Sequence, residues 1–353
     1  MRIAFLIGQL YKGGAEKQVY LISRELKKLN QNVSVFTFDI NGIWYDKLIS
    51  VSIPVYQIKR LKSFDFYRLF TLRNQIKKLK LDILFCFGSA ESIYGRLACL
   101  GISTEAIVCL RNQSWNNYKI NIIDRILKPS HKYICNSYSG YRFLKDTIGV
   151  QQYRLKRIPN IVNHNEIIKT CSNFHDSRLL KKSKNHVHVG WVGSLSERKD
   201  PHLLLDIARC VFKINKNFHF FIIGDGPLRN QIADRIISDY RYKKVHLIGY
   251  IDNAKCIWPY MDIGLSTSKI EGTPNVFYEA VVFNKPFIAP NVGDYPWLIK
   301  NSGLLYKTRD PEYISKILIK YIDNIKDNKS LKLKFDIINQ NAKEIANSYL
   351  SFK

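Results

Sequence analysis

The chain of 353 residues lacks the long apolar runs of a membrane-spanning protein. No run approaches the roughly 20 residues that a helix needs to cross a bilayer. The apolar start, Met1 to Gly8, is too short for a signal-peptide core and has no small-residue cleavage site. We interpret it as the first strand of a mature cytoplasmic protein, with a peripheral place on the inner face of the membrane as a further option.

Cysteine pairing motifs are also missing. The seven cysteines are odd in number and contain no C-x-x-C pair, and most of them stand in apolar runs. This pattern predicts buried, reduced thiols rather than disulfides or metal ligands. The eight histidines show no metal-ligand spacing either.

Acidic residues are scarce: 29 Asp and Glu stand against 55 Lys and Arg, a net charge of +26. Such a field favours partners that carry phosphate, namely nucleic acid, anionic lipid or a pyrophosphate substrate. A compositional bias without a specific role explains the charge equally well. Against a nucleic-acid-binding protein, the basic residues are dispersed and no known binding motif occurs.

A basic stretch over residues 59–80 is unusually aromatic at its start, with Phe64, Phe66, Tyr67 and Phe70. Helical spacing of its leucines and isoleucine predicts an apolar stripe that packs on a sheet. The remaining surface could rest on an anionic membrane. The alternative is a solvated basic face over an ordinary core helix.

The length suggests about two domains. Short apolar runs alternate with helical patterns, which predicts α/β architecture with parallel, doubly wound sheets. We expect domains at residues 1–168 and 187–329, a linker at 169–186 and a final helix within 330–353. The predicted strands cover residues 2–7, 32–38, 55–58, 82–87, 106–110, 131–135 and 155–158, and then 187–192, 218–223, 245–247, 263–266, 286–289 and 303–306.

The stretch Glu271-Gly-Thr-Pro-Asn-Val-Phe-Tyr-Glu279 follows one of these strands. Thr273 can cap a helix through its hydroxyl, and Pro274 suits the first helical position. Free N–H groups at a helix start attract phosphate oxygens. With a carboxylate on the loop and another one turn into the helix, the corner suits a ligand with phosphates and vicinal hydroxyls, such as a nucleotide-sugar. Two solvated glutamates beside a helix start are the alternative.

This corner resembles the motif of the retaining glycosyltransferase family 4, which has the GT-B fold. The resemblance implies two Rossmann-like β/α/β domains that face a cleft. It implies that Glu279 binds the ribose hydroxyls and Glu271 the transferred sugar. The backbone that would hold the phosphates comprises Gly272, Thr273, Pro274, Asn275 and Val276. The nucleotide base would lie against the main chain near Tyr250 and Ile251.

Other motifs along the chain extend the resemblance. The loop Gly193-Ser-Leu-Ser-Glu-Arg-Lys199 is similar to the family's Gly-Arg-Leu-x-x-x-Lys loop, in which the Arg and Lys hold the diphosphate. Lys199 matches that Lys, whereas Ser194 replaces the Arg, and we hypothesise that Arg198 supplies some of the missing charge.

The N-terminal half resembles the family in one loop and departs from it in another. Gly13, Gly14 and Glu16 match the Gly-Gly-x-Glu loop that faces the cleft in the family. Many members carry a histidine near the reacting sugar, where this chain has Arg111 and Asn112. The resemblance therefore leaves the catalytic base unassigned.

The sequence contains no D-x-D pair, which transferases of the other common fold use to hold a metal on the diphosphate. We therefore expect no metal and no cofactor, with Lys199, Arg198 and the helix start in the metal's place. The predicted enzyme is a retaining hexosyl- or N-acetylhexosaminyltransferase that moves a sugar, from a UDP-sugar, to a glycan or lipid-pyrophosphate-linked acceptor in bacterial-type cell-surface polysaccharide synthesis. An epimerase of the same fold is the alternative; a phosphorylase would need a pyridoxal-phosphate lysine context that is not found.

Overall fold

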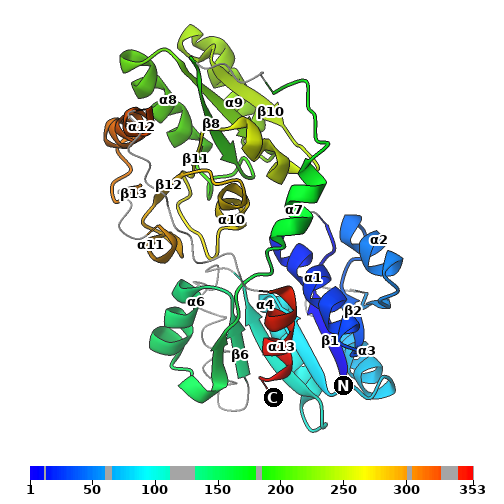
Figure 1. Cartoon of the computed structure of the whole chain (residues 1–353). Coiled ribbons are helices and arrows are strands. Elements are labelled where there is room, and N and C mark those ends of the chain that lie inside the picture. The colour runs from blue at the N-terminus through cyan, green and yellow to red at the C-terminus, as the bar shows by residue number, and fades with distance from the viewer. Residues whose placement is uncertain are drawn as a thin grey trace. The chain divides into compact units, whose positions relative to one another are not determined.

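The computed structural model describes residues 1–11, 13–59, 66–111, 132–179, 185–299, 304–326 and 341–352. The chain divides into two compact units, which Figure 1 shows in sequence colours. Unit 1 comprises residues 1–161 and 340–353, and unit 2 comprises residues 162–339. In both units every described strand pair is parallel, which confirms the predicted architecture.

The sheet of unit 1 has seven strands in the order β3-β2-β1-β4-β5-β6-β7. Each strand lies within one residue of its predicted bounds. The inner strands are short apolar runs buried on both faces, whereas the edge strands β3 and β7 are mostly half-buried. The strands are β1 (Arg2–Ile7), β2 (Asn32–Thr37), β3 (Val55–Gln57), β4 (Ile83–Phe87), β5 (Glu105–Leu110), β6 (Lys132–Cys135) and β7 (Leu155–Arg157).

Helices cover both faces of this sheet. Alternate residues of β1 divide between two cores, with Phe5 in one and Leu6 in the other. The helices are α1 (Gly14–Lys28), α2 (Ile43–Ser50), α3 (Phe66–Lys78), α4 (Ser89–Cys99), α6 (Tyr138–Arg142) and α13 (Ala342–Leu350), with the short η2 (Phe143–Ile148) and η3 (Gln152–Arg154).

The C-terminal helix α13 belongs to unit 1. It lies beside α1 (Figure 1) and buries Ile345, Ala346 and Tyr349 in the same core as Phe5. The predicted final helix spans residues 330–353, whereas α13 covers Ala342–Leu350, and residues 327–340 lie outside the described part of the chain.

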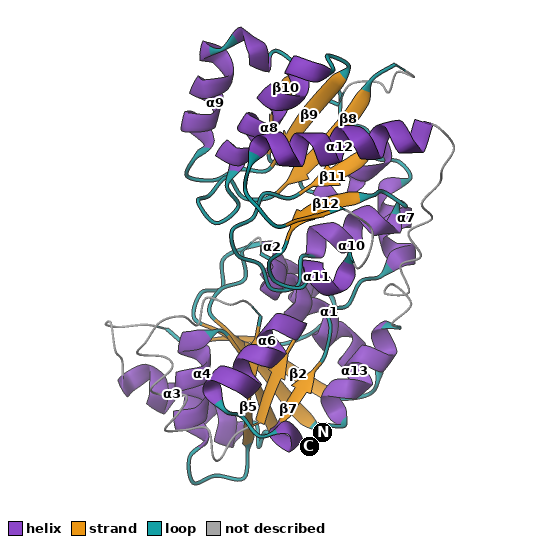
Figure 2. Cartoon of the chain, turned by 90° about the vertical axis from the view of Figure 1, so that its left-hand side faces the viewer, coloured by secondary structure: helices purple, strands orange, loops and turns teal. Residues whose placement is uncertain are grey.

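Unit 2 has six strands in the order β10-β9-β8-β11-β12-β13. They are β8 (Val187–Val192), β9 (Phe218–Ile223), β10 (Val245–Gly249), β11 (Ile263–Leu265), β12 (Phe287–Pro290) and β13 (Leu305–Tyr306). The helices are α7 (His164–Cys171), α8 (Pro201–Ile214), α9 (Arg229–Ser238), α10 (Asn275–Val282), α11 (Tyr295–Leu298) and α12 (Pro311–Lys326), with η4 (Tyr240–Tyr242) and η5 (Ala254–Tyr260). Figure 2 shows α8 and α12 packed together across one face of the strands.

The boundary between the units falls at residues 161 and 162 rather than in the predicted linker at 169–186. Helix α7 packs onto unit 2, where Ile167 and Cys171 share a small core with Val282. Cys171 also forms a disulfide with Cys256, so the prediction of only reduced thiols is wrong for this pair. The two cysteines are 85 residues apart in sequence, and only the packing of α7 on η5 brings them together.

A row of histidines crosses the first strands of the unit 2 sheet. His219 Nδ1 lies 2.9 Å from His246 Nε2, and their rings stack. The rings of His186 and His188 lie 4.7 and 5.8 Å from that of His219. Burial, and then these neighbouring rings, lower the pKa of His219 to about 4.

This shift predicts an acid-sensitive unit 2. Because His219 binds a proton near pH 6.5 when unfolded but only near pH 4 when folded, the free energy of unfolding should fall as the pH drops between these values. The loss is at most about 3 kcal/mol. Urea unfolding at several pH values measures it, and His219→Phe should flatten the slope. The exposed His175 is the control, since His175→Gln should keep the full slope; an unchanged slope in His219→Phe would refute the assignment.

Candidate active site

The candidate site of unit 2 lies at the carboxyl edge of its sheet. The loop 193–200 follows β8, and the loop 266–274 follows β11. These strands are parallel neighbours, so both loops leave the sheet at the same edge. In open parallel sheets, ligands bind at this edge.

Glu271 is the centre of the site and is 5 % exposed. Lys199 Nζ donates to Glu271 Oε1, and Ser268 Oγ donates to the same oxygen at 2.7 Å. Arg198 Nη1 lies 3.8 Å from Glu271 Oε2. The structure therefore brings Lys199, Arg198 and Glu271 together, as their proposed shared site requires. Arg198 keeps half of its side chain exposed, whereas Lys199 is mostly buried.

Hydrogen bonds hold the Lys199 loop on the loop after β11. Trp191 Nε1 donates to Thr267 Oγ1 at 2.9 Å, and Thr267 Oγ1 donates to the carbonyl oxygen of Lys199 at 2.8 Å. Arg309 donates to Asp200 and to the Thr267 carbonyl, both at 2.7 Å. Sequence reasoning missed Arg309, because an isolated arginine beyond β13 carries no motif.

Two glycines permit the close approach of these loops. Gly293 has φ of +56°, and a Cβ there would lie 2.6 Å from the carbonyl oxygen of Glu271. Gly224 has φ of +134°, and a Cβ there would lie 1.9 Å from the carbonyl oxygen of Gly193. The turn after β9 thus packs directly on the start of the Lys199 loop.

The start of α10 differs from the prediction. Pro274, not Thr273, is the N-cap residue, and the hydroxyl of Thr273 donates to Asp294 Oδ2 at 3.1 Å. The backbone at Gly272 accepts the N–H of Asp294, which ties the loop to residues 293–294. The N-cap residue Pro274 makes no side-chain hydrogen bond to the start of α10, and the first N–H groups of a helix attract phosphate oxygens.

The other residues predicted to bind the nucleotide-sugar lie at the same edge of the sheet or about one turn into α10. Glu279 is half-buried on α10, as are Asn275 and Val276 at its start. Tyr250 and Ile251 follow β10, with Tyr250 exposed and Ile251 buried.

In unit 1, the predicted glycine loop precedes α1. Gly13 is extended and Gly14 is the first helical residue. The Glu16 carboxylate folds back on the loop so closely that a Cβ on Gly13 would lie 2.1 Å from Glu16 Oε2. Burial raises the pKa of Glu16. Glycine at position 13 therefore makes room for the carboxylate of Glu16.

Sequence reasoning missed a second carboxyl group at a glycine loop, the half-buried Glu91 in the first turn of α4. A Cβ on Gly88 would lie 2.0 Å from Glu91 Oε2, and one on Gly8 would lie 2.4 Å from Glu91 Oε1. Burial, reinforced by Glu16, raises the pKa of Glu91 to about 7, which suits a proton acceptor at neutral pH. A signal was present, since Gly88-Ser-Ala-Glu91 repeats the pattern Gly13-Gly-Ala-Glu16.

Arg111 directly follows β5, and neighbouring side chains accept hydrogen bonds from it. Its Nη1 donates to Asn160 Oδ1 at 3.0 Å, and its Nη2 donates to the Tyr349 hydroxyl. The guanidinium lies 4.5 Å from the centre of the Phe87 ring. Arg111 thus ties α13 to the sheet edge, and the neighbouring Asn112 lies outside the described residues.

Two family models match consecutive parts of the chain. Residues 12–166 match the model described as Glycosyltransferase Family 4, and residues 186–324 match the one described as Glycosyl transferases group 1. Together they cover most of the chain. The chain belongs to this glycosyltransferase family.

Characterised relatives of this glycosyltransferase are named for transfer to lipid-linked glycans. A Campylobacter jejuni protein is 25 % identical over 80 % of this chain and 77 % of its own length. It is named GalNAc-alpha-(1->4)-GalNAc-alpha-(1->3)-diNAcBac-PP-undecaprenol alpha-1,4-N-acetyl-D-galactosaminyltransferase. The Escherichia coli UDP-Gal:alpha-D-GlcNAc-diphosphoundecaprenol alpha-1,3-galactosyltransferase is 23 % identical over 74 % of this chain and 71 % of its own.

Solved structures place the glycosyltransferase in the GT-B fold. Anabaena HepE in complex with UDP-glucose superposes with a TM-score of 0.77 at 18 % identity, over 100 % of this chain and 97 % of its own. The two parallel-sheet units are thus the expected Rossmann-like domains.

Neither a metal-binding cluster nor a membrane-spanning helix occurs among the described residues of the glycosyltransferase. No group of three or more His, Cys, Asp or Glu residues is placed to hold a metal ion. No described helix is long and apolar enough to cross a membrane.

Proposed function

We propose that this glycosyltransferase moves a sugar from a UDP-sugar to a glycan or lipid-pyrophosphate-linked acceptor, with retention of configuration and without a metal. The observation that carries the proposal is the buried Glu271, held by Lys199 and Ser268 beside Arg198 at the carboxyl edge of the unit 2 sheet. Carboxylate and cations together suit a ligand that carries both hydroxyls and phosphates.

The proposed site places positive charge where negative charge develops during the reaction. Breakage of the sugar–phosphate bond leaves negative charge on the departing diphosphate, and Lys199, Arg198 and the N–H groups at the start of α10 would stabilise it. Glu271 would accept hydrogen bonds from the transferred sugar. Glu279 would accept them from the ribose, because an ionised carboxylate can take two adjacent hydroxyls.

The named relatives support the proposed classes of sugar donor and glycan acceptor. Both named relatives act on acceptors linked through diphosphate to undecaprenol, and one is named for UDP-Gal. Both are alpha-transferases, and an α-linked nucleotide-sugar gives an α-linked product only with net retention. The basic composition of the chain fits an acceptor that carries a negatively charged diphosphate.

Contact with an anionic membrane is part of the proposal. Phe66, Tyr67 and Phe70 are exposed on α3, whereas Leu72 and Ile76 of the same helix are buried. The predicted apolar stripe thus packs inward and leaves an aromatic, basic face outward, which suits an interfacial helix. Phe64 lies outside the described residues.

A screen of UDP-, GDP- and ADP-sugars in the presence of EDTA tests the proposed function. Slow hydrolysis of one UDP-sugar, and transfer to an undecaprenyl-diphosphate glycan, should survive the chelator. Activity lost in EDTA and restored by Mn²⁺ would count against the metal-free site. Epimerisation of the donor without any acceptor would favour the epimerase alternative instead.

Glu279→Gln should chiefly raise the KM for the donor, because glutamine leaves only one acceptor oxygen for two ribose hydroxyls. Steady-state kinetics with varied donor concentration measure the change. Glu312→Gln, on the exposed start of α12, is a matched control that should leave the KM unchanged. A donor KM that does not move in Glu279→Gln would remove Glu279 from the ribose site.

A further inference from the structure

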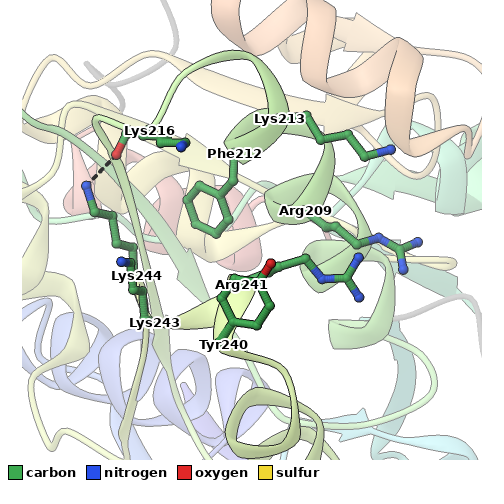
Figure 3. A pocket seen from close by; sticks show the side chains of 8 residues that line it. All are labelled: Arg209, Phe212, Lys213, Lys216, Tyr240, Arg241, Lys243 and Lys244. Atoms are coloured by element: carbon green, nitrogen blue, oxygen red, sulfur yellow. Dashed lines mark hydrogen bonds between the residues drawn. The ribbon is translucent and has the colours of Figure 1, made fainter.

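A second site candidate lies at the amino edge of the unit 2 sheet, where β9 and β10 begin (Figure 3). It is a pocket of about 300 Å³, large enough for a small ligand. Six of the residues that line it are basic, and we call it the basic pocket: Arg209, Lys213, Lys216, Arg241, Lys243 and Lys244.

The two arginines of the basic pocket have acidic partners outside its lining. Asp206 lies 3.5 Å from Arg209, and Asp239 lies 2.6 Å from Arg241. The arginine side chains of these pairs stay 39 % and 49 % exposed. Asp206 also bonds Arg235, so these acids offset only part of the arginine charge and leave that of the lysines uncompensated.

The four lysines have no ion pair within the part of the chain that the structure describes. Lys213, Lys216 and Lys243 are exposed, and Lys244 Nζ donates only to the carbonyl oxygen of Lys216. In Figure 3, Lys213 lies on one side of the pocket and Lys216 and Lys244 on the other. Four like charges around one concavity repel one another, so a bound multivalent anion would stabilise them.

Two aromatic rings occupy the middle of the pocket between these lysines (Figure 3). Phe212 packs edge-on against Phe220, with 5.6 Å between the ring centroids, so its position is fixed by the core. Tyr240 is 84 % exposed, and the neighbouring Ile237 is 83 % exposed. The pocket therefore offers an apolar surface beside its charges, which solvated lysines alone would not provide.

The basic pocket is separate from the proposed donor site. Lys199 follows the carboxyl end of β8, whereas the pocket residues precede the amino ends of β9 and β10. The strands β8 and β9 run parallel over six residues each, so the two sites lie about 20 Å apart along the sheet. A donor bound at Lys199 would not fill the pocket.

We infer that the basic pocket binds the phosphate groups of a second anionic ligand, with an apolar or ring-shaped part against Phe212 and Tyr240. Lysines bind phosphates as point charges and adapt to groups of different geometry. Two sources present this chemistry: the headgroups of an anionic phospholipid surface, and a soluble phosphorylated molecule. The binding experiment separates them.

The lipid arm measures sedimentation of the full chain with vesicles of phosphatidylcholine and phosphatidylglycerol in equal amounts. The double variant Lys213→Gln/Lys243→Gln should bind these vesicles at least about tenfold more weakly, because each lysine near an anionic surface strengthens binding to it substantially. The control is Lys316→Gln/Lys320→Gln, which removes the same charge from exposed positions of α12 outside the pocket.

The soluble arm titrates tripolyphosphate calorimetrically. Because the proposed donor site also takes phosphates, both double variants and their parent carry Lys199→Ala in this arm. Thermal unfolding of each variant verifies that it folds, and the pocket substitutions are all at exposed side chains.

Weaker binding of the pocket variant than of the control in either arm supports the inference, and the arm that responds identifies the source. Loss confined to vesicles assigns the pocket to lipid headgroups, and loss confined to tripolyphosphate assigns it to a soluble phosphate. Equal binding by the pocket and control variants in both arms, or no binding by the unmodified pocket, would overturn it. Neither result depends on turnover, so failure here is distinct from failure of the proposed glycosyl transfer.

Discussion

Replacing Lys199 with alanine should lower turnover at least about a hundredfold, the usual effect of losing one charge-stabilising donor from an active site. Lys199 is mostly buried and its ammonium group bonds directly to Glu271, so water cannot easily replace it. Single-turnover measurements at saturating donor isolate the chemical step from donor binding.

The control for this prediction is Lys269→Ala. Lys269 lies on the neighbouring loop and pairs with Glu197 at 3.3 Å, with much of both side chains exposed. It carries the same charge near the same loops but does not contact Glu271, so its loss should change turnover by less than about threefold. Near-normal turnover in Lys199→Ala would remove Lys199 from the site; equal losses in both variants would show a general charge effect.

The strands of both units could be predicted because the pattern of neighbouring residues is enough to identify each of them. A run such as Ile83–Phe87 is continuously apolar, as a strand buried on both faces must be, and no distant partner is needed to recognise it. The loop from Gly193 to Lys199 and the loop at Glu271 were likewise predictable, because each keeps a local pattern of residue types that resembles the family.

Features that depend on distant contacts were not predictable in this way. Thr273 is a good N-cap residue in isolation, but Asp294 accepts its hydroxyl after the chain folds back. Arg309 reaches the site from beyond β13, and Cys171 meets Cys256 only through the docking of α7. In each case the residue type allowed several roles, and tertiary packing selected one.

The contact between Lys199 and Glu271 also predicts a stability effect. Both side chains are largely buried, so removing one partner leaves a poorly hydrated charge: Lys199 without the carboxylate, or Glu271 with only the half-exposed Arg198 at 3.8 Å. Lys199→Met and Glu271→Gln should each lower the free energy of unfolding of unit 2 by about 3 kcal/mol. Denaturant unfolding of the full chain, followed by the fluorescence of its tryptophans, measures these losses.

The double variant Lys199→Met/Glu271→Gln should recover most of that loss, because neither charge then remains buried without its partner. The exposed pair Lys269 and Glu197 supplies the matched cycle, with an expected coupling below about 1 kcal/mol. Additive losses at Lys199 and Glu271 would contradict the buried pair. Turnover should stay low in the double variant even where stability returns, since a neutral pair can neither offset charge on a departing diphosphate nor accept two sugar hydroxyls.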